Sequence, residues 1–205
     1  MLTEAWKDPD WGMLLSLKMT TGARRGEICG LHWPQLDLDT GVAVFQSSIS
    51  QIAGDVWEKD IKTHQHRRVT LDPEIVEALR AHRARCEERA ASVDTRARGD
   101  GFVFSPTPGC SVRTSPNTLT QRYGRLADRV GIATHLHSLR HYSATELIAA
   151  GVDIRTVAGR LGHSGGGSTT LRTWAQTTAR IRGGRSTANI LGSRAHAALS
   201  AATAR

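Results

Sequence analysis

The sequence predicts a mainly α-helical α+β fold, a helical bundle with one small three-stranded antiparallel sheet. Most of the chain carries apolar residues at helical spacing between helix-capping residues, whereas residues 36–71 show short β-type runs separated by turns. The length of 205 residues and the hydrophobic fraction of 39% suit a single globular unit with a sizeable core. The sequence contains no internal repeat, which excludes a solenoid.

The N-terminal third is expected to form two helices and then the sheet. Apolar residues at helical spacing predict a helix over 3–20 that ends before Thr21-Gly22, and a second helix over 23–31. A turn at 37–41 precedes the predicted strands, which are residues 42–52, 56–61 and 67–71. The first two strands flank Ala53-Gly54, and the connection between the last two carries Lys62.

The rest of the chain is expected to be helical. Pro73 begins a helix that runs to about Ala91, a polar loop follows, and 102–104 is a buried strand-like trio. Asn117 is the predicted cap of a helix over 118–130, and Asp153 that of a helix ending near Leu161. Three further helices or loops complete the pattern: a helix over 137–150, a glycine loop at 165–167 and a short helix over 168–176.

The charge of the chain is uneven. Residues 121–205 contain 12 Arg, no Lys and 3 acidic residues, a net charge of +9, whereas residues 1–120 hold 15 basic and 16 acidic residues. The whole chain carries +8 and has a pI of about 10.2. A block this basic, interleaved with apolar helix residues, favours an anionic partner, and nucleic acid above all.

Three isolated cysteines argue against a disulfide scaffold or a cysteine-based zinc site, because none belongs to a CxxC pair. The sequence has no signal peptide and no apolar run of membrane-spanning length. We therefore expect a cytoplasmic, nucleoid-associated protein.

Five basic residues form a candidate site for phosphate chemistry: Arg24, Lys62, His137, Arg140 and His163. Attack on a phosphodiester increases the negative charge on its non-bridging oxygens, and fixed cations aimed at them lower the barrier. Two guanidinium groups can hold both oxygens, a lysine can protonate the leaving oxygen, and histidine can move a proton. Such a set needs no metal or other cofactor, since the cations supply the charge.

Four segments, in this order and spacing, resemble the tyrosine recombinases of the phage integrase family. They are Thr21-Gly22-Ala23-Arg24-Arg25-Gly26-Glu27-Ile28, Lys62-Thr63, His137-x-x-Arg140-His141 and Leu161-Gly162-His163-Ser164. The resemblance implies an integrase catalytic-domain fold in which Arg24 and Arg140 clamp the scissile phosphate of duplex DNA. It also implies that Lys62 is the general acid and that His137 and His163 assist proton transfer. Glu27 and His141 would be supporting residues that hold the catalytic side chains in place.

The position of the nucleophile departs from the family pattern. The family has a tyrosine about ten residues after the Gly-His pair, where this chain has Trp174. Indole offers an N–H donor but no oxygen that could attack phosphorus. Tyr142 is a weak substitute, because it is expected to pack in the core beside the Arg-His pair. The resemblance therefore implies the catalytic domain of a site-specific DNA recombinase of the integrase type. Trp174 at the nucleophile position would impair its cleavage of DNA. The alternative is a non-catalytic DNA-binding or regulatory protein, or a prophage remnant, derived from the same fold.

The resemblance also suggests a domain division. Residues 1–192 would form the catalytic domain and residues 193–205 an Ala-rich, helical tail, while the family's N-terminal DNA-binding domain would be absent. Recombination would take place in a tetramer of identical subunits on DNA, away from any membrane.

Simpler interpretations exist for several of these residues. Arg24 alone could be a surface residue paired with Glu27, and Lys62 could simply be solvated. His137 and His141 could form a zinc pair with His135 or His163, although no acidic residue lies between them. The three glycines at 165–167 lack the Lys-Ser/Thr of a phosphate loop and fit a plain linker better.

Overall fold

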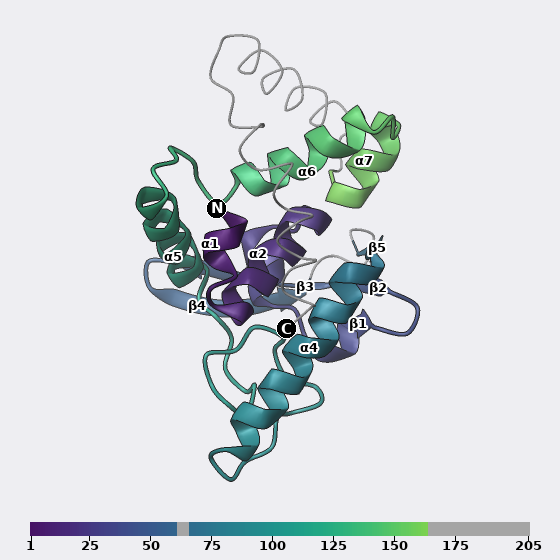
Figure 1. The fold of residues 1–205 in the computed structure, drawn as a ribbon. Coiled ribbons are helices and arrows are strands. Elements are labelled where there is room, and N and C mark those ends of the chain that lie inside the picture. The colour runs from purple at the N-terminus through teal and green to yellow at the C-terminus, as the bar shows by residue number, and fades with distance from the viewer. Residues whose placement is uncertain (61–65, 164–205) are drawn as a thin grey trace.

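The computed structural model describes residues 1–60 and 66–163 and confirms a mainly helical fold with small antiparallel sheets (Figure 1). Helix α2 (Pro9–Thr21) lies at its centre and is buried along nearly its whole length. The predicted helix over 3–20 is divided, because the side chain of Asp8 caps the backbone N–H groups of Asp10 and Trp11 and Pro9 begins a new helix. A short helix α1 (Leu2–Ala5) precedes this break.

The second helix, α3 (Arg25–Cys29), is shorter than the predicted 23–31 and leads into the 3₁₀ turn η1 (Trp33–Gln35). It starts two residues late because Gly22 ends α2 in the left-handed conformation, with φ of 62°. Glycine adopts this conformation without the steric penalty of a side chain. The turn between α2 and α3 is therefore tight, and it carries Arg24.

Two antiparallel sheets replace the single predicted sheet. One has the strand order β1-β2-β5, from Leu36–Asp37, Val42–Phe45 and Arg67–Thr70. The other is the hairpin of β3 (Ser47–Ile52) and β4 (Asp55–Asp60), in which Ile52 pairs with Asp55. The predicted strand over 42–52 was therefore wrong in one respect, because the chain changes partner at Gln46. The turn of the hairpin has positive φ at Ala53 and Gly54, as two-residue hairpins require.

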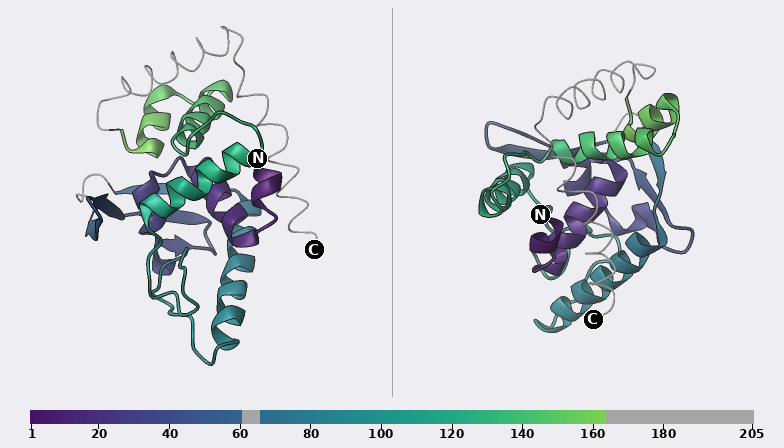
Figure 2. Two further views of the ribbon diagram at one scale, coloured as in Figure 1. Left: turned by 90° about the vertical axis from the view of Figure 1, so that its left-hand side faces the viewer. Right: turned by 45° about the horizontal axis from the view of Figure 1, so that its top comes forward.

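Helix α4 (Pro73–Ala91) has the predicted bounds and carries buried residues along its length, and its C-terminal end forms one end of the molecule (Figures 1 and 2). Helix α5 (Pro116–Arg129) begins earlier than predicted, because Ser115 rather than Asn117 precedes its first turn. The predicted 102–104 trio is buried, and Phe102 forms an isolated bridge with His32.

Helices α6 (Ser138–Ala149) and α7 (Ile154–Leu161) lie together on the side opposite the far end of α4 (Figure 2). The predicted cap is confirmed, since the Asp153 carboxylate accepts from two backbone N–H groups at the start of α7. Gly162 then ends α7 in the left-handed conformation, as Gly22 ends α2. The predicted glycine loop, the helix over 168–176 and the tail lie outside the described residues.

Most buried apolar side chains form one core around α2, and a smaller cluster of Ala144, Val157 and Leu161 joins α6 to α7. Trp11 and Trp33 are buried in the main core, whereas Trp57 on β4 is exposed. Within the described part of the chain, no helix is both long and apolar enough to cross a membrane.

Candidate functional site

Three arginines from separate elements meet where α2 and α7 end. Arg24 lies in the turn before α3, Arg67 on β5 and Arg140 on α6. We call these three residues, together with Glu27 of α3, the guanidinium cluster. Gly22 allows the close packing, because a Cβ atom there would lie 2.3 Å from a methyl carbon of Leu161. Arg24 and Arg140 are far apart in the sequence, and the packing of the helix ends against each other brings them together.

Arg24 is the accessible member of the cluster. Its side chain is 48% exposed. One terminal nitrogen donates to Glu27 Oε1 at 2.7 Å and the other to the carbonyl oxygen of Gly162 at 2.8 Å. The ion pair that the sequence suggested as a simple interpretation of Arg24 is therefore present. It orients a guanidinium that still faces solvent, which suits binding of an external anion.

Arg140 is buried, with 4% of its surface exposed. Its terminal nitrogens donate to the carbonyl oxygens of Gly22 at 2.6 Å and of Leu161 at 2.5 Å. Burial and the neighbouring Arg24 and Arg67 lower the pKa of Arg140, yet a guanidinium keeps its charge at physiological pH. Arg140 therefore links the end of α2 to the end of α7 and adds a positive charge beneath Arg24.

Glu27 is a buried carboxylate shared by two arginines. It accepts from the backbone N–H of Arg24 at 2.8 Å and from Arg67 at 2.5 Å, besides the side chain of Arg24. Burial alone would raise the pKa of Glu27, but Arg67 and Arg24 hold it below its ordinary value. The cluster so combines three guanidinium groups with one carboxylate. Its net charge is positive, as an anion site requires.

The predicted histidines lie next to this cluster. His137 precedes α6, and its ring meets that of His141 edge-on with centroids 4.6 Å apart. Loss of hydration, followed by His141 and Lys18, lowers the pKa of His137 to about 4. Burial and then Arg140, Arg24 and Arg67 lower the pKa of His163 to about 4. Both imidazoles are neutral near pH 7 and can accept a proton, while a bound anion would favour their charged forms.

Two predicted site residues, Lys62 and Trp174, fall outside the described residues. Tyr142 is partly buried against the core, as expected, and burial raises the pKa of its hydroxyl to about 12. Among residues 1–60 and 66–163, no three His, Cys, Asp or Glu side chains are grouped so that they could hold a metal ion.

The structure adds Arg67 and Lys18 to the site, neither of which was predicted from the sequence. The signal for Arg67 was its alternation with Val69 and Leu71, which share the buried face of β5 and the residues after it. The signal for Lys18 was a single lysine in the apolar run of α2.

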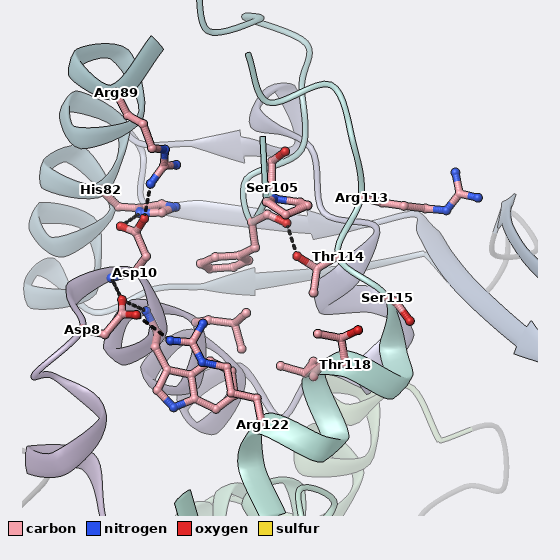
Figure 3. A pocket seen from close by; sticks show the side chains of 15 residues that line it. Asp8, Asp10, His82, Arg89, Ser105, Arg113, Thr114, Ser115, Thr118 and Arg122 are labelled. Carbon is pink, nitrogen blue, oxygen red and sulfur yellow. Dashed lines mark hydrogen bonds and ion pairs between the residues drawn. The ribbon is translucent and has the colours of Figure 1, made fainter. Parts of the chain in front are cut away.

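A separate pocket of about 480 Å³ lies at the beginning of α2, between α4, α5 and residues 104–115 (Figure 3). Two of its arginines have carboxylate partners, whereas Arg113 donates to the carbonyl oxygen of Val56. Asp10 accepts from Arg89 at 2.5 Å and lies 3.0 Å from His82, while Asp8 accepts from Arg122 at 2.5 Å. The guanidinium of Arg122 also lies over the Trp11 ring, 4.4 Å from its centroid. The pocket therefore has two carboxylates for its three arginines, whereas the guanidinium cluster has one carboxylate for three.

The fold and the guanidinium cluster define a mainly helical domain with a positively charged site between helix ends. A family model described as the phage integrase family matches residues 10–179. The chain belongs to the phage integrase family.

Known proteins of similar sequence are tyrosine recombinases. The chain is 29% identical over 177 residues to the tyrosine recombinase XerC-like protein of Caldanaerobacter subterraneus subsp. tengcongensis, covering 80% of this chain and 45% of that protein. It is 32% identical over 153 residues to tyrosine recombinase XerC of Xylella fastidiosa (strain M23), covering 74% of this chain and 44% of the relative. The chain thus spans less than half the length of these relatives.

Solved structures support the fold. XerA recombinase superposes with a TM-score of 0.63 at 25% identity, covering 89% of this chain and 61% of the other. The Tn1549 transposon integrase, solved in complex with transposon right end DNA, superposes with a TM-score of 0.67 at 21% identity. That match covers 85% of this chain and 58% of the integrase. The predicted family and fold class are confirmed.

Proposed function

We propose that this chain is the catalytic domain of a site-specific DNA recombinase that grips the scissile phosphate of duplex DNA with fixed cations. The observation that carries this proposal is the charge imbalance of the guanidinium cluster. Glu27 is the one carboxylate in this cluster of three guanidinium groups and pairs with two of them, while Arg24 remains 48% exposed above the buried Arg140. A phosphodiester placed against Arg24 would supply the missing negative charge.

Each proposed role follows from the hydrogen-bond donors and the proton-carrying groups of the site. Arg24 presents its guanidinium to solvent, and each terminal nitrogen of Arg140 keeps a second hydrogen beyond the one given to a carbonyl. The neutral His137 and His163 would move protons to or from the reacting oxygens. Lys62 would protonate the leaving oxygen, and Glu27 and His141 would hold their neighbours in place. The reaction class is transesterification that needs no metal or other cofactor.

The nucleophile is where this chain differs. Trp174 occupies the position at which the family has its tyrosine, and an indole cannot form a phosphoprotein bond. We therefore propose that the chain as given binds DNA but is impaired in cleavage. The same observation favours a second function, that of a non-catalytic DNA-binding or regulatory protein, or a prophage remnant, derived from this fold.

The proposed assembly is a tetramer of identical subunits on attachment-site DNA in the cytoplasm. Residues 1–192 would form the catalytic domain and residues 193–205 a tail.

The test is a nicked DNA substrate that traps covalent intermediates, incubated with the unchanged chain, Trp174→Tyr and the matched control Trp174→Phe. We expect an adduct with Trp174→Tyr alone, because only this variant gains an oxygen nucleophile. An adduct with the unchanged chain would show that another residue attacks. DNA binding without any adduct would favour the non-catalytic function, and absence of DNA binding at low salt would contradict both.

A further inference from the structure

Four successive carbonyl oxygens at the end of α2 each accept a hydrogen bond from a cationic side chain. We call residues 20–23 the carbonyl turn. The pairs are Arg160 with Thr20 at 3.3 Å, Arg67 with Thr21 at 3.3 Å, Arg140 with Gly22 at 2.6 Å and Lys18 with Ala23 at 2.6 Å. Cations at a helix C-terminus complement its partial negative charge. Three of these cations reach the turn from β5, α6 and α7, whereas Lys18 belongs to α2 itself.

Lys18 is the least exposed of the four cations, with 1% of its surface accessible. Lysine is almost never fully buried unless paired, because an ammonium group without compensation is costly away from water. The hydrogen-bond partner of the Lys18 Nζ is a carbonyl, which carries no full charge. Burying the ammonium group of Lys18 is therefore energetically costly. The contacts around it show which part of the backbone it holds in place.

Lys18 and Glu27 hold opposite sides of one peptide group. The Ala23 carbonyl accepts from Lys18, and the N–H of Arg24, in the same planar unit, donates to Glu27 Oε2 at 2.8 Å. Fixing both polar atoms of this unit fixes the orientation of its plane. The direction in which the Arg24 side chain leaves the backbone depends on that plane.

We propose that Lys18 is a positioning residue for Arg24, holding the peptide plane from which Arg24 reaches the phosphate and adding a buried positive charge beneath it. This inference rests on the function proposed above. Lys18 does not touch the DNA in this arrangement, and it acts through the Ala23 carbonyl and through its charge.

The charge of Lys18 depends on pH in an accessible range. Burial, and then Arg140 of α6, lower the pKa of Lys18 to about 8, while Glu27 and Cys29 of α3 oppose the shift and Arg67 of β5 adds to it. His137, at the start of α6, also faces Lys18 and is neutral above about pH 4. The free protein therefore loses the Lys18 proton as the pH rises through about 8. A phosphate bound above it would favour the charged form, so DNA binding is linked to proton uptake in this range.

The test compares Lys18→Met with Lys7→Met, which removes the same charge from an exposed lysine just before the other end of α2. Affinity for a fluorescent random-sequence duplex is measured by anisotropy across pH at constant salt. At neutral pH we expect Lys18→Met to bind about tenfold more weakly than the unchanged chain, and Lys7→Met to stay within about twofold. The deficit of Lys18→Met should shrink above about pH 8, as the unchanged chain loses its own Lys18 charge. A purely structural role predicts a deficit that does not depend on pH.

Equal weakening by both variants, or a deficit that is the same at every pH, overturns the role of Lys18 while leaving the proposed function intact. Failure of the unchanged chain to bind the duplex overturns the proposed function itself. If Lys18→Met does not fold by circular dichroism, calorimetry on the N-terminally acetylated, otherwise unchanged chain decides. In two buffers of different ionisation enthalpy at about pH 8.5, DNA binding should take up part of a proton. Absence of uptake overturns the proposal.

Discussion

The two ends of α2 hold arginines in opposite electrostatic settings. At the beginning of the helix, Arg85 and Arg89 both pair with Asp10 and Arg122 pairs with Asp8, so each of these three arginines has a carboxylate partner (Figure 3). At the end, about 20 Å away for a helix of 13 residues, Arg24 and Arg67 share Glu27, while Arg140 donates to backbone carbonyl oxygens. The helix macrodipole favours both arrangements, carboxylates at the N-terminus and cations at the C-terminus.

The difference separates structural arginines from those available to a ligand. At the beginning of α2, two carboxylates pair with all three of Arg85, Arg89 and Arg122, so these groups are satisfied within the protein and an external anion gains little. In the guanidinium cluster, one carboxylate lies among three guanidinium groups, and the excess positive charge is held in place by backbone carbonyls, which carry only partial charges. Counting arginines along the sequence does not distinguish these cases, but assigning each one its partner does.

The largest expected effect is at Glu27. Glu27→Gln removes the carboxylate between Arg24 and Arg67 and leaves buried guanidinium charge without a counter-ion. We expect a loss of about 3–5 kcal/mol in the free energy of unfolding, measured by denaturant titration. The control Asp8→Asn removes a carboxylate that is 52% exposed, and should cost less than about 1 kcal/mol. Similar losses in the two variants would contradict the comparison.

At the beginning of α2, Asp10→Asn should cost about 1–3 kcal/mol, because Asp10 is half-buried and bonded to His82 and Arg89. Burial opposes ionisation, but these bonds hold the pKa of Asp10 well below its ordinary value. Its contribution is therefore complete above about pH 4 and is lost as the pH falls further. Unfolding curves of both proteins should converge in strong acid. A constant difference at every pH would contradict this origin.

DNA affinity should respond differently at the two ends. Arg24→Gln is expected to weaken duplex binding about tenfold, or about 1.4 kcal/mol, and to reduce the slope of log affinity against log salt by about one. Arg122→Gln removes the same charge from a side chain that is 43% exposed but paired, and should leave the slope unchanged. Anisotropy titrations over a range of salt test both. Equal slope changes would mean that net charge alone governs binding.

The smallest expected effect is a pH dependence of folding stability that arises from the histidines beside the guanidinium cluster. The pKa values of His137 and His163 in the folded protein are about 4, below the ordinary 6.5, so folding favours their neutral forms. The unfolded chain then binds more protons between about pH 6.5 and 4, and the protein loses stability as the pH falls through this window. Duplex DNA should oppose the loss, raising the melting temperature more at about pH 5 than at pH 7 at fixed ionic strength. Equal stabilisation at both pH values would contradict coupling between the histidines and the site.

Much of the fold could be predicted from local signals. The Asp153 cap and the bounds of α4 follow from capping residues and helical spacing, which are properties of neighbouring residues. The change of partner at Gln46 could not be predicted, because burial alternates without interruption from Val42 to Ile49. Strand pairing depends on segments that are distant in the sequence. The alternation of buried and exposed residues along a strand does not show which strand will be its neighbour.

For the candidate site, the resemblance placed Arg24, Glu27 and Arg140, and the structure brings Arg24 and Arg140 to the same helix ends. Their roles stay predictions, as do those of Lys62 and Trp174. Lys18 and Arg67 were not predicted from the sequence, because the interactions that place them in the site include hydrogen bonds to backbone carbonyl oxygens. Backbone carbonyls are identical in every residue, and so they leave no trace in the amino-acid letters.

Gly22 has a consequence for genetic screens. A side chain there would strike Leu161, push α7 away and draw the Gly162 carbonyl from Arg24, and the residue's φ of 62° is unfavourable to other residue types. A screen for variants that lose DNA binding should return Gly22 alongside the arginines, although glycine has no side chain with which to touch DNA. Inferring contact from loss of function would then assign the wrong residue to the interface.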